Sequence, residues 1–385
     1  LWCASLGFSE PRLAEVAYRR NVVAYRAINE VVRSAVSVPW VLFRSSDGER
    51  RRLAEHALIG LLARPNPMQA RAEFIEAVLG FYLIAGNSYI EAVGADGPPR
   101  ELWTVRPDRM RVVKGPTGLP QGYEFGHGTE RITWEADPVT GRSGILHVRA
   151  FNPLDDWYGQ SPIEAAATAI DQRNAADAWN MSLLQNGARP SGALVYAPAE
   201  GEANLSDEQF ERLRRQLEEQ QQGTLNSGRP LLLEGGLDWK EMSLSPRDMD
   251  FLEAKHSSAR DIAQAFGVPP MLLGIPGDST YSNYREARLA LWEETVVPLL
   301  RHLRDELNAW LVPMFAPGLA LDIDLDEVPA LTLRRERCWE MLRRADFLTV
   351  NEKRRAVGYA PIDGGDVVVR PGSRIVTPAA PTAES

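Results

Sequence analysis

The sequence predicts an α+β fold in which a mixed helix-and-strand layer is joined to a pair of long helices. Three observations lead to this prediction. Helices and short strands alternate through the first third of the chain, two Pro-led helix starts frame a small insert, and a long helix with an apolar stripe follows them. The simplest geometry for the two framing helices is a helical hairpin with a compact module at its tip.

The first third opens with a helix over about 16–36, because apolar residues recur there near helical spacing. Pro39 then requires an extended chain through Trp40–Phe43. A second helix, Phe74–Ala85, should end near Gly86. Runs of β-branched and aromatic residues between Gly and Pro predict four strands: Ser88–Val93, Glu101–Val105, Met110–Val113 and Ile145–Val148.

The two framing helices begin with capping patterns. Ser161 stands at an N-cap, with Pro162 at the first helical position and Glu164 three residues after the serine, and the Ala-rich helix should run to about Gly187. Ser245-Pro246-Arg247-Asp248 opens the second helix, which should run to Phe266. The pattern leaves open whether these helices contact each other or lie against a neighbouring subunit.

The insert between them, 190–244, is predicted to be small and mixed. A charged helix starting at Ser206 has only a few apolar residues with which to pack, so it should be solvated. Three short strands are expected around it: Ala193–Tyr196, Leu231–Leu233 and Leu237–Met242.

The last third begins with a loop that shows no periodicity, because Gly267-Val268-Pro269-Pro270 stops the preceding helix. A helix from Asn283 to Trp310 carries a sustained apolar stripe, and Pro298 should kink it. After it we expect an acidic-faced strand at Leu321–Leu325 and two helices, at Leu331–Ala345 and Asn351–Val357. The Pro-, Ala-, Ser- and Thr-rich tail from Pro371 should be unstructured.

Composition restricts the classes of function. The 385 residues include 43 Lys plus Arg and 52 Asp plus Glu, a formal net charge of −9, and 44% hydrophobic residues, as expected of a folded chain. A net acidic chain lacks the basic footprint of a protein that grips nucleic acid by its phosphates. Cys3 and Cys338 have no partner at metal-ligand spacing, and no apolar run is long enough for a membrane span. The first residue is Leu1, so we expect the true N-terminus to be missing.

The sequence lacks the common motifs for catalysis, nucleotide binding and metal binding. The sequence contains no phosphate-binding loop, no nucleophile elbow and no zinc-binding H-E-x-x-H. Asp322-Ile323-Asp324-Leu325-Asp326-Glu327 is the one tempting metal motif, but strict acidic–apolar alternation favours a half-buried strand, and Asp155-Asp156 fits a turn. We expect no metal site and no cofactor. The five histidines should be packing or surface residues: His56, His127, His147, His256 and His302.

Basic clusters allow two interpretations. Arg50-Arg51-Arg52 stands alone, whereas three further clusters fall within 331–356, where eight basic residues face four acidic ones. A solvated helix face explains these clusters, and so does contact with phosphates or with an acidic partner.

Several segments, in this order, together resemble one family, the portal proteins of tailed phages and gene transfer agents, of the long-tailed-phage type. No single segment is specific, but their joint order and spacing are. They are Arg64-Pro65-Asn66-Pro67, Leu83-Ile84-Ala85-Gly86-Asn87-Ser88-Tyr89, Gly159-Gln160-Ser161-Pro162-Ile163, Asn186-Gly187-Ala188-Arg189-Pro190-Ser191-Gly192, Ser245-Pro246-Arg247-Asp248, Ile262-Ala263-Gln264-Ala265-Phe266-Gly267-Val268-Pro269-Pro270-Met271-Leu272-Leu273-Gly274, Leu348-Thr349-Val350-Asn351-Glu352 and Gly364-Gly365-Asp366.

The resemblance implies a ring-forming subunit with a wing, a stem, a clip and a crown. In this chain the parts correspond to an α+β wing (1–158), a first stem helix (159–189), a small α/β clip (190–244) and a second stem helix (245–267). These are followed by a tunnel loop (268–283), the returning wing (284–330), a helical crown (331–370) and a disordered tail (371–385).

The resemblance also implies a function: a dodecameric ring at one capsid vertex, through which double-stranded DNA is packaged and ejected. The implied partners are other copies of the chain, the major capsid protein, the terminase large subunit and the head–tail adaptor, with no membrane. We expect synthesis in a bacterial cytoplasm and assembly into a virion or virus-like particle; the sequence does not distinguish a virus from a gene transfer agent. The alternative function is that of a hydrolase or transferase with an unrecognised active site.

Three sets of residues are candidates for contact in such a ring. The tunnel loop that would line the channel is Pro270, Met271, Leu272, Leu273, Gly274, Ile275, Pro276, Gly277, Asp278, Ser279, Thr280 and Tyr281. The basic crown residues that could face DNA are Arg334, Arg335, Arg343, Arg344, Lys353, Arg354 and Arg355. The clip residues that could meet a partner are Glu208, Glu211, Arg212, Arg215, Glu218 and Glu219.

A channel wall that bound phosphates tightly would hold DNA rather than let it slide. The charge of −9 is therefore compatible with a conduit for DNA.

Overall fold

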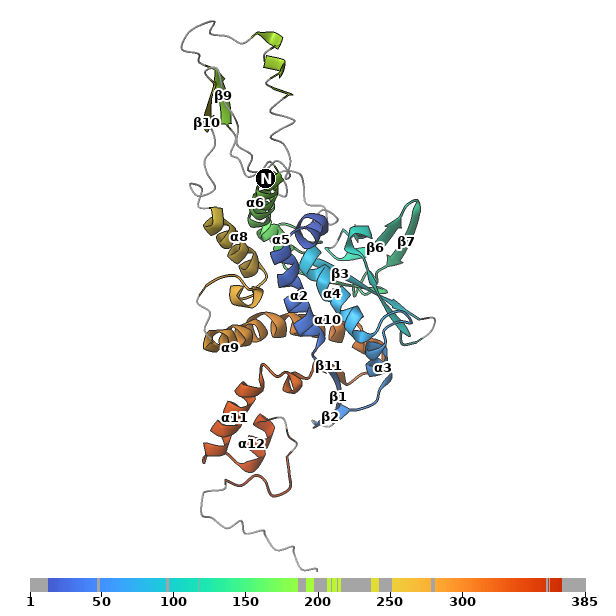
Figure 1. Ribbon diagram of the computed structural model, residues 1–385. Coiled ribbons are helices and arrows are strands. Elements are labelled where there is room, and N and C mark those ends of the chain that lie inside the picture. The colour runs from blue at the N-terminus through green and yellow to red at the C-terminus, as the bar shows by residue number, and fades with distance from the viewer. Residues whose placement is uncertain are drawn as a thin grey trace, which may run out of the picture.

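The structure is a computed structural model of the 385-residue chain. It describes residues 13–46, 49–94, 97–116, 118–185, 192–196, 206–208, 210–212, 214–215, 237–241, 251–277, 281–357, 359 and 361–368. The described part is elongated, with sheets on one side of a central group of helices, two helices at one end and a pair of short strands at the other (Figure 1).

The central helices and one three-stranded sheet supply much of the main core. Asn21 caps the α-helix that begins at Val22, because its Oδ1 accepts hydrogen bonds from the amides of Val23 and Ala24. The single helix predicted over 16–36 is therefore wrong: a π-helical turn ends before this cap and an α-helix begins after it. Among the elements of this core are η1 (Ala14–Arg19), α2 (Val22–Val36), α3 (Ala57–Ala63), α4 (Arg71–Ala85), α10 (Val297–Trp310) and the antiparallel sheet β11-β1-β2 (Leu319–Ile323, Trp40–Ser46, Glu49–Leu53).

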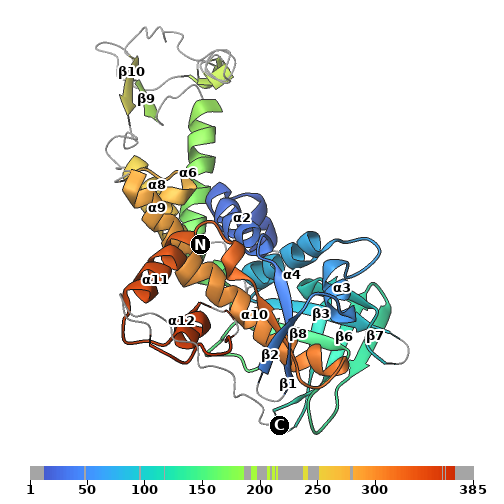
Figure 2. The same cartoon turned by 90° about the horizontal axis from the view of Figure 1, so that it is seen from below.

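Two further antiparallel sheets lie face to face on the far side of the core from α6 and α8 (Figure 2). The four strands predicted between 88 and 148 are confirmed, and β2, β6 and β7 are strands that the sequence did not predict. A second, smaller core of aromatic and aliphatic side chains, including Tyr89 and Tyr123, fills the space between the sheets. The sheets have the orders β4-β3-β8 (Glu101–Val105, Asn87–Val93, Ile145–Arg149) and β5-β6-β7 (Met110–Lys114, Pro120–His127, Glu130–Glu135).

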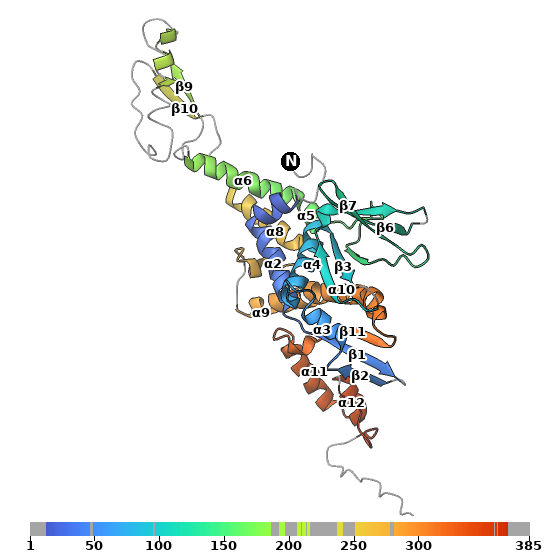
Figure 3. The ribbon, with the colours of Figure 1, turned by 90° about the vertical axis from the view of Figure 1, so that its right-hand side faces the viewer.

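The long helices that frame the insert are also present, with a change at the first of them. Ser161 accepts the Ile163 amide as predicted, but the helix is interrupted at Ala166, where ψ is 3°. This gives a short α5 (Pro162–Ala165) followed by α6 (Ala167–Gln185). Helix α8 (Phe251–Ala265) lies beside α6, and the strands β9 (Gly192–Tyr196) and β10 (Leu237–Glu241) pair beyond them (Figure 3).

The helix predicted from Asn283 to Trp310 is divided by a π-helical segment. It comprises α9 (Tyr281–Ala290), η5 (Leu291–Val296) and α10, with Pro298 at the start of α10. Since proline has no backbone N–H to donate, the i→i+5 hydrogen bonding of a π-helix just before Pro298 fits the position of this proline. The acidic strand is confirmed as β11, and the two later helices are confirmed as α11 (Thr332–Arg344) and α12 (Val350–Ala356).

Some predictions lie outside the described residues. These are the strand Leu231–Leu233, the helix start at Ser245 and the tail from Pro371.

Candidate functional site

The two long helices contact each other, which the sequence left open. Arg173 on α6 donates to the backbone carbonyl of Lys255 on α8 at 3.1 Å, and the Lys255 ammonium lies 2.6 Å from the Asp177 carboxylate. Ile170, Ala259 and Ile262 are buried where these helices enter the main core. The hairpin is therefore rooted in the core, while much of the outer half of α6 remains exposed.

A buried polar joint holds the root of this hairpin against the sheets. The Asn87 Oδ1 accepts hydrogen bonds from the Gly159 amide at 2.7 Å and from His147 Nε2 at 2.9 Å. The Ser161 hydroxyl donates to the Ile84 carbonyl at 2.6 Å. Two of the segments that carry the family resemblance, 83–89 and 159–163, thus meet in space to form one joint.

His147 serves this joint as a neutral packing residue. Its ring stacks on Tyr89 with centroids 4.3 Å apart, and its Nε2–H faces the Asn87 oxygen. Burial, together with the positive charge of Arg149, lowers the pKa of His147 to about 3. The prediction of a packing histidine is confirmed at this position.

The predicted tunnel loop is more ordered than the absence of periodicity indicated. Residues Pro270–Leu273 form a 3₁₀ turn, so the expectation of an irregular loop is wrong there. The side chains of Leu272, Leu273 and Ile275 pack against the core of the same subunit, which supplies the apolar contacts that order the turn. Asp278, Ser279 and Thr280 lie outside the described residues, and the role of the loop in lining a channel stays a prediction.

Two contacts fix the ends of this loop. Helix α8 ends in a Schellman-type turn at Gly267, where φ is +63°, and the Thr295 hydroxyl in η5 donates to the Gly267 carbonyl at 2.6 Å. At the other end, Arg260 on α8 donates to the Pro276 carbonyl at 2.8 Å. The loop is therefore tied to both the stem and the long helix of the wing.

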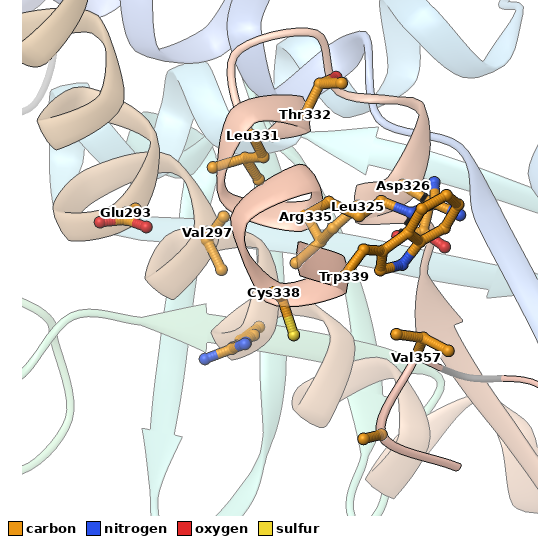
Figure 4. Close-up of a pocket in the computed structure, with 12 residues that line it drawn as sticks. Glu293, Val297, Leu325, Asp326, Leu331, Thr332, Arg335, Cys338, Trp339 and Val357 are labelled. Carbon is orange, nitrogen blue, oxygen red and sulfur yellow. Dashed lines mark ion pairs between the residues drawn. The ribbon is translucent and has the colours of Figure 1, made fainter. Parts of the chain in front are cut away.

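The predicted basic crown residues are partly engaged by acidic residues of the crown and of the adjoining wing. Arg335 lies 3.5 Å from Asp326 and over the Trp339 ring, beside a cavity of about 490 Å³ between crown and wing (Figure 4). Arg344 lies 2.5 Å from Glu340, and Arg355 lies 3.8 Å from Asp366. The remaining members of the set are Arg334, whose side chain is not described, the exposed Arg343, the half-buried Lys353 and Arg354 over Tyr359.

The last two segments of the resemblance also meet. Asn351, only 2% exposed, donates to the Ile362 carbonyl and to Asp366 and accepts the Ile362 amide. A Cβ on Gly365 would overlap the Asn351 side chain, so glycine is required at this contact. Residues 348–352 and 364–366 therefore pack against each other at the end of the crown.

The predicted clip surface is described in part. Glu208, Glu211, Arg212 and Arg215 are exposed and helical, and Glu211 lies 3.4 Å from Arg214. Glu218 and Glu219 lie outside the described residues.

The acidic strand and the first basic cluster neutralise each other. Asp322 on β11 lies 2.7 Å from Arg50 and 3.1 Å from Arg304, and Asp324 lies 2.9 Å from Arg52. The strand interpretation of this acidic run is confirmed only as far as Ile323 and is wrong beyond it, because Asp324 caps a 3₁₀ turn at Leu325–Glu327. The Asp155 carboxylate accepts the amides of Trp157 and Tyr158, as the turn interpretation predicted.

Within the described part of the chain, no group of three His, Cys, Asp or Glu side chains could hold a metal ion. Among the same residues, no helix is both long enough and apolar enough to cross a bilayer. Sequence reasoning missed Asn87 and Asn351 as organisers of their joints, because each acts on segments distant in the chain and only its presence in a quoted segment pointed to it.

The elongated α+β subunit, with a two-helix stem rooted in a wing and a separate crown, has the architecture that the resemblance implies for a ring-forming subunit. The chain belongs to the phage portal protein family, whose family model, described as "Phage portal protein", matches residues 22–358. Both the resemblance and the portal fold predicted from the sequence are confirmed, and the chain is a portal protein of a capsid vertex.

The chain is similar to two proteins of known sequence, one of them a portal protein. An uncharacterized protein of Rickettsia bellii (strain RML369-C) is 46% identical over 350 residues, covering 91% of this chain and 89% of that protein. The portal protein of Enterobacteria phage HK97 is 23% identical over 356 residues, covering 90% and 80%.

Solved structures show the same fold. A chain of the neck of a native gene transfer agent particle, computed with C12 symmetry, has a TM-score of 0.70 at 43% identity and covers 92% of this chain and 94% of that chain. An HK97-family phage portal protein from Corynebacterium diphtheriae has a TM-score of 0.57 at 17% identity, covering 81% and 96%.

Proposed function

We propose that twelve copies of this chain form a ring at one vertex of a capsid and that double-stranded DNA passes through the ring during packaging and ejection. The observation that carries the proposal is the likeness to the gene transfer agent neck with C12 symmetry, at 43% identity over 92% of this chain. At that identity, with nearly full coverage, we expect this subunit to present the same ring-forming surfaces as that neck protein. The particle is then a gene transfer agent or a phage, with this chain at the junction of head and tail.

The shape of the subunit supports the same proposal. Much of the outer half of α6 is exposed although it is rich in alanine, and Trp179 and Met181 on it are 36% and 57% exposed. Helices of this composition gain stability by packing against other helices. Neighbouring copies in a ring supply such partners.

We assign the partner contacts to three parts of the subunit. The clip, through Glu208, Glu211, Arg212 and Arg215, docks the terminase large subunit and later the head–tail adaptor, the wing meets the major capsid protein, and the loop around 270–281 lines the channel. The exposed Arg343 gives the crown a point of contact with DNA phosphates. The chain acts as a conduit rather than as an enzyme.

Native mass spectrometry and electron microscopy of the purified protein test the ring. Twelve-subunit particles with a central channel are expected; a protein that stays monomeric at every concentration would overturn the proposal and return attention to the enzyme alternative.

The partner surface is tested by reversing the charges of Glu208 and Glu211 together, with Glu130 and Glu135 of the exposed strand β7 reversed as the control. Loss of adaptor and terminase binding in intact rings is expected for the clip variant alone. Equal binding by both variants would place the docking surface elsewhere.

The channel is tested by a cysteine at the exposed Gly277, in a background without Cys3 and Cys338, labelled with a bulky maleimide. Rings should assemble but fail to package DNA, whereas the same label at the exposed Ser257 of α8 should be tolerated. Normal packaging with the label at Gly277 would remove this loop from the channel.

A further inference from the structure

The core between the two facing sheets of the wing ends in an open pocket of about 340 Å³. Tyr89 and Tyr123 close the inner part of this core, and the pocket begins one step further along the same strands. Its walls carry aromatic and aliphatic side chains, one carboxylate (Glu91) and two guanidinium groups (Arg106 and Arg109). The side chains that carry the argument are Glu91, Trp103, Phe125, Ile132 and Trp134.

Strand register explains why these side chains converge. Glu91 on β3 lies directly opposite Trp103 on β4, so the carboxylate and this indole share one face of the first sheet. On the second sheet Phe125 pairs with Ile132, and Trp134 is two residues further along β7, on the same side as Ile132. The two sheets therefore present Glu91 between two indoles.

The carboxylate of Glu91 has little within the chain to neutralise it. In the described residues its side-chain partner is the Trp134 indole, whose Nε1–H donates to Oε1 at 3.2 Å. Arg106 lines the same pocket but is committed to Asp108 through two hydrogen bonds of 2.9 and 2.7 Å. Partial burial raises the pKa of Glu91 more than this indole bond lowers it, so the ionised group sits in an unfavourable environment.

We propose that this pocket binds the cationic side chain, arginine above lysine, of a partner protein that docks on the wing. The cation would form an ion pair with Glu91 and stack between the faces of Trp103 and Trp134, an arrangement that suits a planar guanidinium. Ile132, which is 53% exposed at the rim, would contact the aliphatic stem of the same side chain. The sheets that carry the site lie far from β9 and β10 of the clip (Figure 3), so the site would serve a partner other than the one at the clip.

Fluorine NMR on the assembled protein labelled with 5-fluorotryptophan tests the site. The chain has ten tryptophans, so the resonances of the two indoles are assigned with W103F and W134F. The probe is N-acetylarginine amide, and its control is N-acetylcitrulline amide, which has the same shape without the charge. The arginine probe should shift the resonances of Trp103 and Trp134 in a saturable way, and the citrulline probe should bind about tenfold more weakly or not at all.

Substitutions separate charge recognition from apolar docking. E91Q should weaken binding of the arginine probe about tenfold, whereas E135Q, next to Trp134 but exposed, should leave it unchanged. Equal binding of both probes, or unchanged binding by E91Q, would overturn the proposal in favour of a merely apolar contact.

Arg109 also lines the pocket, so it could compete with a bound cation for Glu91. R109Q should bind the probe as well as or better than the wild type. The absence of any shift in both the wild type and R109Q would show that the pocket is no cation site.

Discussion

Gly86 and Gly159 are in direct backbone contact. A Cβ on Gly86 would lie 2.6 Å from the Gly159 carbonyl oxygen, and a Cβ on Gly159 would overlap the Gly86 carbonyl oxygen and lie 2.5 Å from the Ala150 amide nitrogen. Gly86 also ends α4 in the left-handed conformation, with φ at +71°. The stem therefore leaves the wing at a point where no side chain fits.

This contact predicts a strong effect of the smallest substitution. G159A should destabilise the fold by about 2–4 kcal/mol, because the added methyl group meets only backbone atoms that cannot move independently. The control is G126A, where a Cβ would have nothing within 4 Å. Chemical denaturation of the two variants measures the difference, and equal stability would show that the joint can relax.

The same joint predicts an acid sensitivity. The buried His147 has a pKa of about 3, whereas an unfolded imidazole titrates near pH 6.5. Between these values the unfolded chain binds the extra proton, so stability should fall by about 1.4 kcal/mol for each pH unit below 6.5.

Denaturation between pH 4 and pH 7 measures this slope. H147Q, which keeps a donor for Asn87 but does not titrate, should show a shallower slope than the wild type by about one proton. Identical slopes would mean that the imidazole gains its proton without leaving the joint.

Both the predictability of this fold and its limits are visible at such joints. The N-cap Ser161 and the end of α4 at Gly86 were predicted because capping depends on residues within one turn. The break at Asn21 was missed although its cap on Val23 and Ala24 is local, and its side chain also pairs with Asn174 on α6, 153 residues away. Local patterns cannot register a partner that only the fold supplies.

The candidate sites follow the same rule. The segment containing Asn351 pointed to the family, but its task of binding Ile362 and Asp366 was visible only after folding. Glu91 and Trp134 were not singled out at all, because they face each other from two different sheets.

The acidic strand predicts a dependence on its basic partners. Partial burial works to raise the pKa of Asp322, but hydrogen bonds from Arg50, the Ile323 amide and Arg304 outweigh it and lower the pKa. The carboxylate therefore contributes stability above the pKa of an unfolded aspartate, and this contribution is lost as the pH falls through the lower folded value. D322N should cost about 1–2 kcal/mol at pH 7.

The control for D322N is D305N, which removes a partner of the same Arg304 at a position 65% exposed. It should cost less than about 0.5 kcal/mol. Thermal denaturation at pH 7 compares them, and similar losses in both variants would contradict a special role for the strand carboxylate.

The Thr295–Gly267 hydrogen bond predicts a way to loosen the loop without disturbing the core. T295V keeps the shape of the side chain and removes the hydroxyl that donates to the Gly267 carbonyl at 2.6 Å. A lost hydrogen bond of this kind is worth about 1 kcal/mol, so local opening of residues 268–277 should become about fivefold more frequent. Arg260 would still hold the Pro276 carbonyl, so the loop should open at its α8 end first.

Hydrogen exchange resolved by mass spectrometry measures this opening. Peptides covering 266–277 should exchange faster in T295V, peptides from α2 should be unchanged, and T295S, which retains the hydroxyl, should behave as the wild type. Because Thr295 lies in η5 and Gly267 ends α8, faster exchange confined to the loop would show that the long wing helix restrains the loop through this bond. Unchanged exchange in T295V would assign that restraint to the packing of Leu272, Leu273 and Ile275 alone.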